Sequence, residues 1–142
     1  MYLDACIVAK LLLAEPDSLR CAEVVEGSTL VSSELVYGEI TSLLLRKQRA
    51  GEIGPALGAS AWTEFERLLA EECLWLAPLT RRVVRDVRTV MLAVHPRISL
   101  RTLDAIHLAT YLSVVTGPFF TRDARLRQAA ELLDIPVVAD WA

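Results

Sequence analysis

The stretch MYLDACIVAKLLL, residues 1–13, is the clearest indication of the fold class of this chain. Its first three residues are apolar or aromatic and predict a short buried strand, which ends at Asp4. The apolar residues that come next recur with helical spacing and share one face of an amphipathic helix: Ile7, Val8, Leu11 and Leu12. A strand followed directly by a helix is a β-α unit.

The same alternation continues along the whole chain of 142 residues. After the first strand we expect strands at 29–32, 74–79, 118–121 and 137–139. We expect a helix between Asp4 and Pro16, and further helices at 19–26, 33–49, 62–71, 81–94, 99–116 and 123–133. Ser33 and Ser99 are the predicted N-caps of two of them, Pro96 breaks the helix before it, and residues 51–59 are expected to form a loop. This alternation predicts an α/β layered fold with a mostly parallel sheet of five strands. The length fits one compact domain, residues 1–142.

The charge of the chain does not point to nucleic acid at first sight. The net charge is −3 and the pI about 5.4, whereas nucleic-acid binders are usually basic. The positive charge is nearly all arginine, a side chain suited to bidentate phosphate contacts. It is grouped in three clusters, any one of which, taken singly, is better explained as a solvated helix face: Arg81, Arg82, Arg85 and Arg88; Arg46, Lys47 and Arg49; Arg122, Arg125 and Arg127.

The apolar content predicts a cytoplasmic rather than a membrane protein. Hydrophobic residues make up 54% of the chain, but the richest run, 5–14, is too short to cross a bilayer and is interrupted by Lys10. Asp4 stands where a signal peptide would need a basic start. Cys6, Cys21 and Cys73 are scattered in apolar stretches without metal-binding spacing, and we interpret them as core residues in a reducing compartment.

Four acidic residues occupy positions that are favourable for chemistry. Asp4 closes the first strand and Asp123 comes after the fourth. In parallel sheets, ligands bind at the carboxyl ends of the strands. Glu39 and Asp104 lie beside the apolar stripes of their helices, within about two turns of the predicted helix starts. We therefore expect all four carboxylates to meet at one edge of the sheet.

Clustered carboxylates favour a divalent cation, because unpaired buried carboxylates are costly and repel one another. Oxygen-only ligands select Mg²⁺ or Mn²⁺ over zinc. One or two such ions can orient a phosphodiester, activate a water and stabilise the leaving oxygen. Taken singly, Asp4 and Asp123 are better explained as helix N-caps, and Glu39 and Asp104 can instead pair with an arginine.

Four segments also resemble the motifs of PIN domains, in order and over nearly the whole chain. YLDACIVAKLLLAEP at 2–16 resembles the opening motif, and SSELVYGEITSLLLRK at 32–47 the second, with Glu39 as its acid. LRTLDAIHLATYL at 100–112 is the closest match, with Asp104 as its acid. FFTRDARLRQAAELL at 119–133 resembles the last motif, with Asp123 as the fourth acid and Thr121 as a nearby hydroxyl.

The resemblance implies a three-layer α/β/α sandwich and a metal-dependent endoribonuclease. A domain this small most resembles the VapC-type toxins of toxin–antitoxin pairs. That resemblance implies an RNA substrate, a homodimer, and a VapB-type antitoxin that covers the acidic site. We expect Asp4, Glu39, Asp104 and Asp123 to hold Mg²⁺ or Mn²⁺, and Thr121 to help place a water or phosphate. The turn at 133–136 departs from the usual pattern, which has a glycine before the final strand.

Other interpretations remain. His107, three residues after Asp104, can be a base or a ligand, but we favour a packed residue bonded to a neighbour. A receiver domain needs an acid at the third strand and a late lysine, and a haloacid-type phosphatase needs a second aspartate at position 6; the sequence has none of these. A PIN-like module that only binds RNA or protein, and a PIN nuclease with a processing role, stay open as alternatives.

Overall fold

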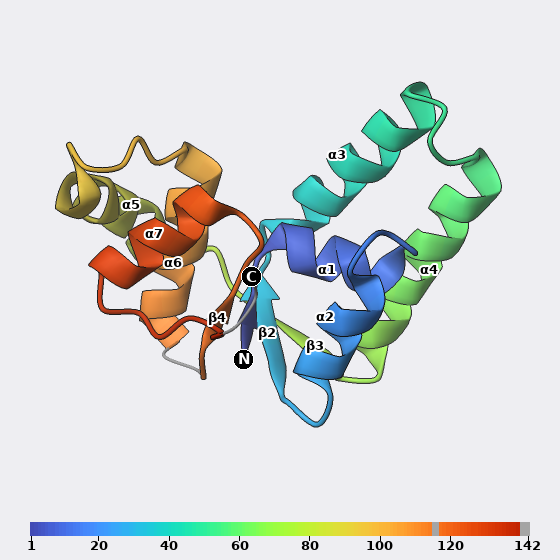
Figure 1. Cartoon of the computed structure of the whole chain (residues 1–142), viewed down its shortest axis with the longest axis horizontal. Helices are drawn as coiled ribbons and strands as arrows, with labels where there is room; N and C mark the ends of the chain where they lie inside the picture. The colour runs from blue at the N-terminus through green and yellow to red at the C-terminus, as the bar shows by residue number, and fades with distance from the viewer. Residues whose placement is uncertain (115–116, 140–142) are drawn as a thin grey trace.

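The structure is a computed structural model and describes residues 1–114 and 117–139. Within these residues a parallel four-stranded sheet, in the order β3-β2-β1-β4, lies between two groups of helices (Figure 1). The strands are β1 (Tyr2–Leu3), β2 (Leu30–Ser33), β3 (Leu74–Ala77) and β4 (Phe119–Phe120). The helices are α1 (Ala5–Leu12), α2 (Ser18–Val25), α3 (Val36–Arg49), α4 (Pro55–Ala70), α5 (Arg81–Val94), α6 (Thr102–Val114) and α7 (Ala124–Leu132).

Each face of the sheet has its own apolar core. Helices α1 to α4 cover one face, and α5 to α7 cover the other (Figure 1). Neighbouring strand residues point to opposite faces, so Tyr2 packs in the core with α5 to α7 and Leu3 in the core with α1 to α4. Phe119 and Phe120 divide in the same way. The predicted α/β fold with a parallel sheet is confirmed.

The prediction of five strands is wrong for the described residues. The segment predicted at 137–139 forms one isolated parallel bridge, between Phe119 and Val137. Phe119 donates its N–H to the Pro136 carbonyl at 2.7 Å, and Val138 donates to the Phe119 carbonyl at 3.0 Å. Pro136 has no N–H to give, and β4 itself has only two residues, so a longer ladder does not form here.

Two predicted helix caps are also wrong. Ser33 is the last residue of β2, and α3 begins only at Val36. The Ser33 hydroxyl still accepts the Leu35 N–H at 3.2 Å, so it satisfies a backbone donor ahead of the helix. Ser99 lies before the start of α6 at Thr102 and does not cap it.

The predicted loop at 51–59 is shorter than expected. Helix α4 starts at Pro55, seven residues before the predicted start at Trp62 (62 minus 55). Gly54 is extended, with φ of −83° and ψ of 168°, and Pro55 occupies the first helical turn, where its missing N–H costs nothing. The predicted helix 81–94 agrees with α5, because Thr80 caps it by accepting the Val83 N–H.

The predicted helix end at about Thr116 falls outside the described part of the chain. Trp62 on α4 is half-buried and packs near Phe65, while Trp75 on β3 is 51% exposed. No helix in residues 1–114 or 117–139 is both long and apolar enough to cross a membrane.

The sheet order fixes where a ligand is expected. Strand β1 lies between β2 and β4, and the chain passes from β1 first to the β2 side and later to the β4 side. Ligands of open parallel sheets bind at such a switch point, beyond the carboxyl ends of the strands. Asp4 comes directly after β1, and Thr121 directly after β4, at this point.

Candidate functional site

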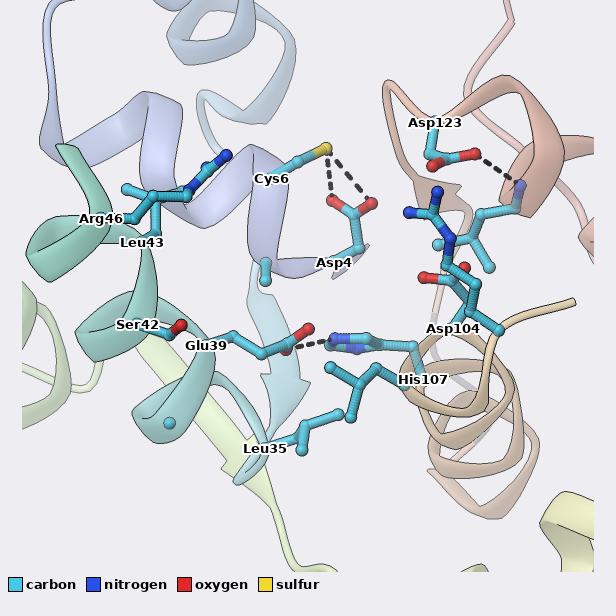
Figure 2. A pocket seen from close by; sticks show the side chains of 15 residues that line it. Asp4, Cys6, Leu35, Glu39, Ser42, Leu43, Arg46, Asp104, His107 and Asp123 are labelled. Atoms are coloured by element: carbon cyan, nitrogen blue, oxygen red, sulfur yellow. Dashed lines mark hydrogen bonds and ion pairs between the residues drawn. The ribbon is translucent and has the colours of Figure 1, made fainter. Parts of the chain in front are cut away.

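An open pocket of about 620 Å³ lies at the switch point, and all four predicted acids line it (Figure 2). They come from four segments. Asp4 is the N-cap of α1, Glu39 lies in the first turn of α3, Asp104 in the first turn of α6, and Asp123 is the N-cap of α7. The sequence expectation that the acids meet at one sheet edge therefore agrees with the structure.

Asp4 is the most deeply buried acid, at 4% exposure. Its Oδ1 caps α1 by accepting the Ile7 N–H at 3.0 Å, so the N-cap interpretation is confirmed. The Cys6 thiol donates to both carboxylate oxygens, at 3.0 and 3.2 Å, and the Thr121 hydroxyl donates to Oδ2. Burial nevertheless raises the pKa of the Asp4 carboxyl, and these bonds only partly oppose it.

Thr121 links two of the acids from behind the pocket wall. Its buried hydroxyl donates to Asp4 and accepts the backbone N–H of Asp123 at 3.0 Å. Asp123 in turn uses Oδ1 to cap α7, accepting the N–H groups of Arg125 at 2.8 Å and Leu126 at 3.0 Å. Oδ2 of Asp123 accepts no hydrogen bond from any described residue, so capping leaves one oxygen for other work.

Asp104 has an unsatisfied carboxylate. Its Oδ2 is the one buried side-chain oxygen or nitrogen in the described residues that has no hydrogen-bond partner. Burial raises its pKa, the charges of Asp123 and Asp4 raise it further, and those of Arg101 and His107 oppose them. A buried acceptor without a donor is costly, so such a group in a folded protein calls for a functional explanation.

Glu39 is bonded to a histidine rather than to an arginine. Its Oε2 lies 2.8 Å from His107 Nε2, across the pocket between α3 and α6 (Figure 2). His107 is 2% exposed, and its Nδ1 lies 3.0 Å from the Tyr2 hydroxyl. The sequence interpretation of His107 as a packed residue bonded to a neighbour agrees with this position. The alternative of an arginine partner for Glu39 is not seen among the described residues, and Arg122, near the pocket in sequence, pairs with Asp17 at 2.9 Å.

Cys6 is a pocket residue that the sequence interpretation missed. We expected it in the core, but it is half-buried, lines the pocket and bonds to Asp4. Burial and the Asp4 charge raise the pKa of its thiol, which keeps the proton that it donates. Its position two residues after Asp4 was the available signal. Of the other cysteines, Cys21 is buried as expected, and Cys73 is exposed, contrary to expectation.

Two arginines stand at the rim of the pocket. Arg46 on α3 and Arg101 before α6 are both exposed and both line it. Neither forms an ion pair with an acid in the described part of the chain. Lys47, next to Arg46 on α3, by contrast pairs with Glu15 and Glu52, each at 2.8 Å. The two arginines thus place positive charge, available to an anion, beside the four carboxylates that line the pocket.

The donor set of the pocket fits a hard divalent cation. Its four carboxylates offer oxygen ligands, which include the unsatisfied Asp104 Oδ2 and an unused oxygen on Asp123. Burial, together with the charges of Asp123 and Asp4, raises the pKa of Asp104. In residues 1–114 and 117–139, no three His, Cys, Asp or Glu side chains lie close enough together to surround one ion. A cation bound here would therefore require the carboxylates to draw together.

Comparison with known proteins gives two findings. A family model described as "PIN domain" matches residues 1–132, a range that includes all four pocket acids. A curated protein named Ribonuclease VapC46, from Mycobacterium tuberculosis, is 36% identical over 142 aligned residues, which cover 98% of this chain and 96% of that protein.

Proposed function

Because the chain belongs to the PIN-domain family, we propose that it is a metal-dependent endoribonuclease, the toxin of a VapBC-type toxin–antitoxin pair. The observation that carries the proposal is the convergence of four acids from four segments on one pocket, with an unsatisfied oxygen on Asp104. Similarity along nearly the full length to a protein named as a VapC ribonuclease supports RNA as the substrate.

Asp4, Glu39, Asp104 and Asp123 are the residues that hold the ion, Mg²⁺ or Mn²⁺, in this proposal. When bound, a divalent cation polarises the phosphodiester, makes a water easier to deprotonate and offsets the charge of the leaving oxygen. Asp104 offers the ion its Oδ2, which is buried and forms no bond with a described residue. Glu39 keeps its Oε1 free of partners in the described part of the chain, so this oxygen is available to the ion.

Arg46 and Arg101 bind the phosphates on either side of the scissile bond. Both are exposed at the rim and free of ion pairs with described acids, and arginine recognises phosphate in a bidentate manner. Such contacts explain how a chain with a net charge of −3 attracts RNA, since only the local charge beside the pocket matters for docking.

Thr121 acts by positioning rather than by touching the substrate. We expected it to place a water or phosphate, but its hydrogen is committed to Asp4 and its oxygen to the Asp123 N–H. It fixes the distance between two metal-binding carboxylates from behind the pocket.

The partners belong to the proposal as well. We propose that the 142 residues act as one nuclease domain in the cytoplasm, as a homodimer, and that a VapB-type antitoxin covers the acidic pocket. The proposal of partner interfaces is supported by large apolar side chains that are exposed, such as Leu19, at 84%, and Trp75, at 51%.

Cleavage of a panel of structured and unstructured RNAs by antitoxin-free protein tests the proposal. We expect cutting with Mg²⁺ or Mn²⁺, none with EDTA, and none by Asp104→Asn. Asp86→Asn is the matched control, because it removes the same charge from a half-buried position on α5, outside the pocket. Absence of cutting by folded wild-type protein over the whole panel would favour a binding module instead, and cutting by Asp104→Asn would remove the site assignment.

A further inference from the structure

A chain of hydrogen bonds runs from the sheet to the pocket through three side chains. The Tyr2 hydroxyl lies 3.0 Å from His107 Nδ1, and His107 Nε2 lies 2.8 Å from Glu39 Oε2. The three residues come from β1, α6 and α3, and are up to 105 positions apart in sequence (107 minus 2). Figure 2 shows the Glu39 and His107 side chains pointing toward one another across the pocket.

The direction of each bond is set by the chemistry of its ends. An ionised carboxylate only accepts, so His107 Nε2 carries the hydrogen and donates it to Glu39. The tautomer with its hydrogen on Nε2 has a bare Nδ1, which accepts the hydrogen of the Tyr2 hydroxyl. Burial raises the pKa of the Tyr2 phenol, so that hydroxyl keeps its hydrogen. Both ring nitrogens of His107 are therefore engaged.

The Tyr2 end of this series of hydrogen bonds is held firmly in place. Tyr2 is fully buried, its backbone is held by strands on both sides, and its ring stacks on Phe119 with centroids 5.1 Å apart. The His107 ring meets the Tyr2 ring edge-on at 5.9 Å and is 2% exposed. The second residue after Tyr2 is Asp4, so the same strand sets the position of both Asp4 and the histidine that holds Glu39.

Glu39 needs such support. Its side chain has three rotatable torsions and is partly exposed, at 18%, so its carboxylate is otherwise free to swing toward solvent. The carboxylates of Asp4, Asp104 and Asp123 line the same pocket and repel it. A single strong hydrogen bond from a buried ring fixes one oxygen, Oε2, and leaves Oε1 without a partner in the described residues.

We propose that Tyr2 and His107 are positioning residues that hold the Glu39 carboxylate in the orientation it needs to share a divalent cation with the aspartates. The inference rests on the proposed function. It excludes His107 as a catalytic base or as a metal ligand, because both of its nitrogens are already engaged and its ring is buried. Bonds that orient a ligand in this way are typically worth about 10- to 100-fold in metal affinity.

Two substitutions of the histidine separate its bond to Glu39 from its packing. In His107→Gln the amide nitrogen lies close to the position of Nε2 and can still donate to Glu39. In His107→Asn the shorter side chain reaches only the position of Nδ1, so the bond to Glu39 is lost. Tyr2→Phe removes only the hydroxyl. Its matched control is Tyr111→Phe, which removes a hydroxyl from the same aromatic cluster, where it donates to the Gly117 carbonyl at 3.2 Å.

The primary readout is Mn²⁺ affinity of the RNA-free protein, measured by titration calorimetry beside thermal unfolding in EDTA. We expect His107→Asn to weaken Mn²⁺ binding about tenfold or more, His107→Gln to stay within about threefold of wild type, and Tyr2→Phe to fall between them. Tyr111→Phe should bind Mn²⁺ like wild type. In RNA cleavage at a fixed Mn²⁺ concentration, His107→Asn should lower kcat and leave KM unchanged, since phosphate contacts at the rim are intact.

Equal Mn²⁺ affinities for wild type, His107→Asn and His107→Gln, in a protein that cuts RNA, would overturn the positioning role and leave the nuclease standing. Losses of affinity that merely track the losses in unfolding temperature, with Asn and Gln alike, would also overturn it. If wild type itself bound no Mn²⁺ and cut no RNA, the proposed function would fail first, and this inference with it.

Discussion

Replacing Asp104 with asparagine should stabilise the metal-free protein and abolish its nuclease activity. The carboxylate has an unsatisfied buried oxygen, and its pKa is raised by burial and by the charges of Asp123 and Asp4. An uncompensated buried charge costs about 3 to 5 kcal/mol. Because Asp104 is only partly buried and Arg101 lies nearby, solvent and counter-charge reduce this to about 1 kcal/mol.

The pH dependence of that gain has a definite sign. The pKa of Asp104 is higher in the folded protein than its ordinary value of 3.8, so the carboxyl favours folding most when it is protonated, below about pH 4. That contribution is lost as the pH rises through the folded pKa. Asparagine does not titrate there, so the advantage of Asp104→Asn over wild type should be near zero below about pH 4 and grow toward neutral pH.

The assay is thermal and urea unfolding of both proteins in EDTA between about pH 4 and 8, with RNA cleavage at about pH 7 in parallel. At neutral pH we expect the variant to melt about 3 °C higher. Its cleavage rate should fall at least about a hundredfold, since a metal site supplies several kcal/mol to the transition state. A variant that is less stable than wild type at neutral pH, or that keeps its activity, would refute the view of Asp104 as an unpaired metal ligand.

Three further outcomes are expected from the same pocket. Thr121→Val should cost about 2 to 3 kcal/mol of unfolding free energy, because it removes a donor to buried Asp4 and an acceptor for the Asp123 N–H. Thr121→Ser keeps the hydroxyl and should cost under about 1 kcal/mol. Equal losses of both variants in urea unfolding would contradict the role of the Thr121 hydroxyl as a link between Asp4 and Asp123. Arg46→Ala should raise KM for RNA and reduce its salt dependence with no change in melting temperature, and an unchanged KM would remove Arg46 from the RNA surface. Mn²⁺ at about a hundred times its Kd should stabilise wild type by about 2.7 kcal/mol in thermal unfolding and Asp104→Asn much less; equal shifts would place the ion elsewhere.

The fold could be predicted from the sequence wherever local signals and tertiary packing agree. Thr80 at one end and Pro96 beyond the other define α5, and the structure has the predicted range 81–94. The segment 55–61 carries Gly58 among small residues and has no strong apolar stripe, so its helix was not predicted. In the structure Gly58 lies against the Gln48 side chain of α3, a tertiary contact that the local sequence does not contain.

The prediction of a fifth strand at 137–139 was wrong for a different reason. Val137 and Val138 have the composition of a strand, but a strand also needs a partner of sufficient length, and β4 offers only Phe119 and Phe120. The length of a neighbouring strand is a tertiary property that local composition does not contain. The result is one bridge in place of a fifth strand.

The acids of the site could be predicted, but the groups that hold them could not. Asp4, Glu39, Asp104 and Asp123 lie at strand ends or on apolar helix faces, and parallel topology alone brings such positions together. His107 bonds to a residue 68 positions away, and Thr121 to one 117 positions away. Such pairs depend on how α6 packs against the sheet and on which strand β4 pairs with, and a single sequence does not show either.

A crystal structure of the protein soaked in Mn²⁺, with anomalous diffraction data, would locate the metal itself. We expect an anomalous peak inside the pocket, about 2.1 Å from carboxylate oxygens that include Asp104 Oδ2, with Glu39 still bonded to His107. A peak at some other place on the molecule, or an empty pocket in which Asp104 has paired with Arg101, would contradict the assignment of these four acids to a metal centre.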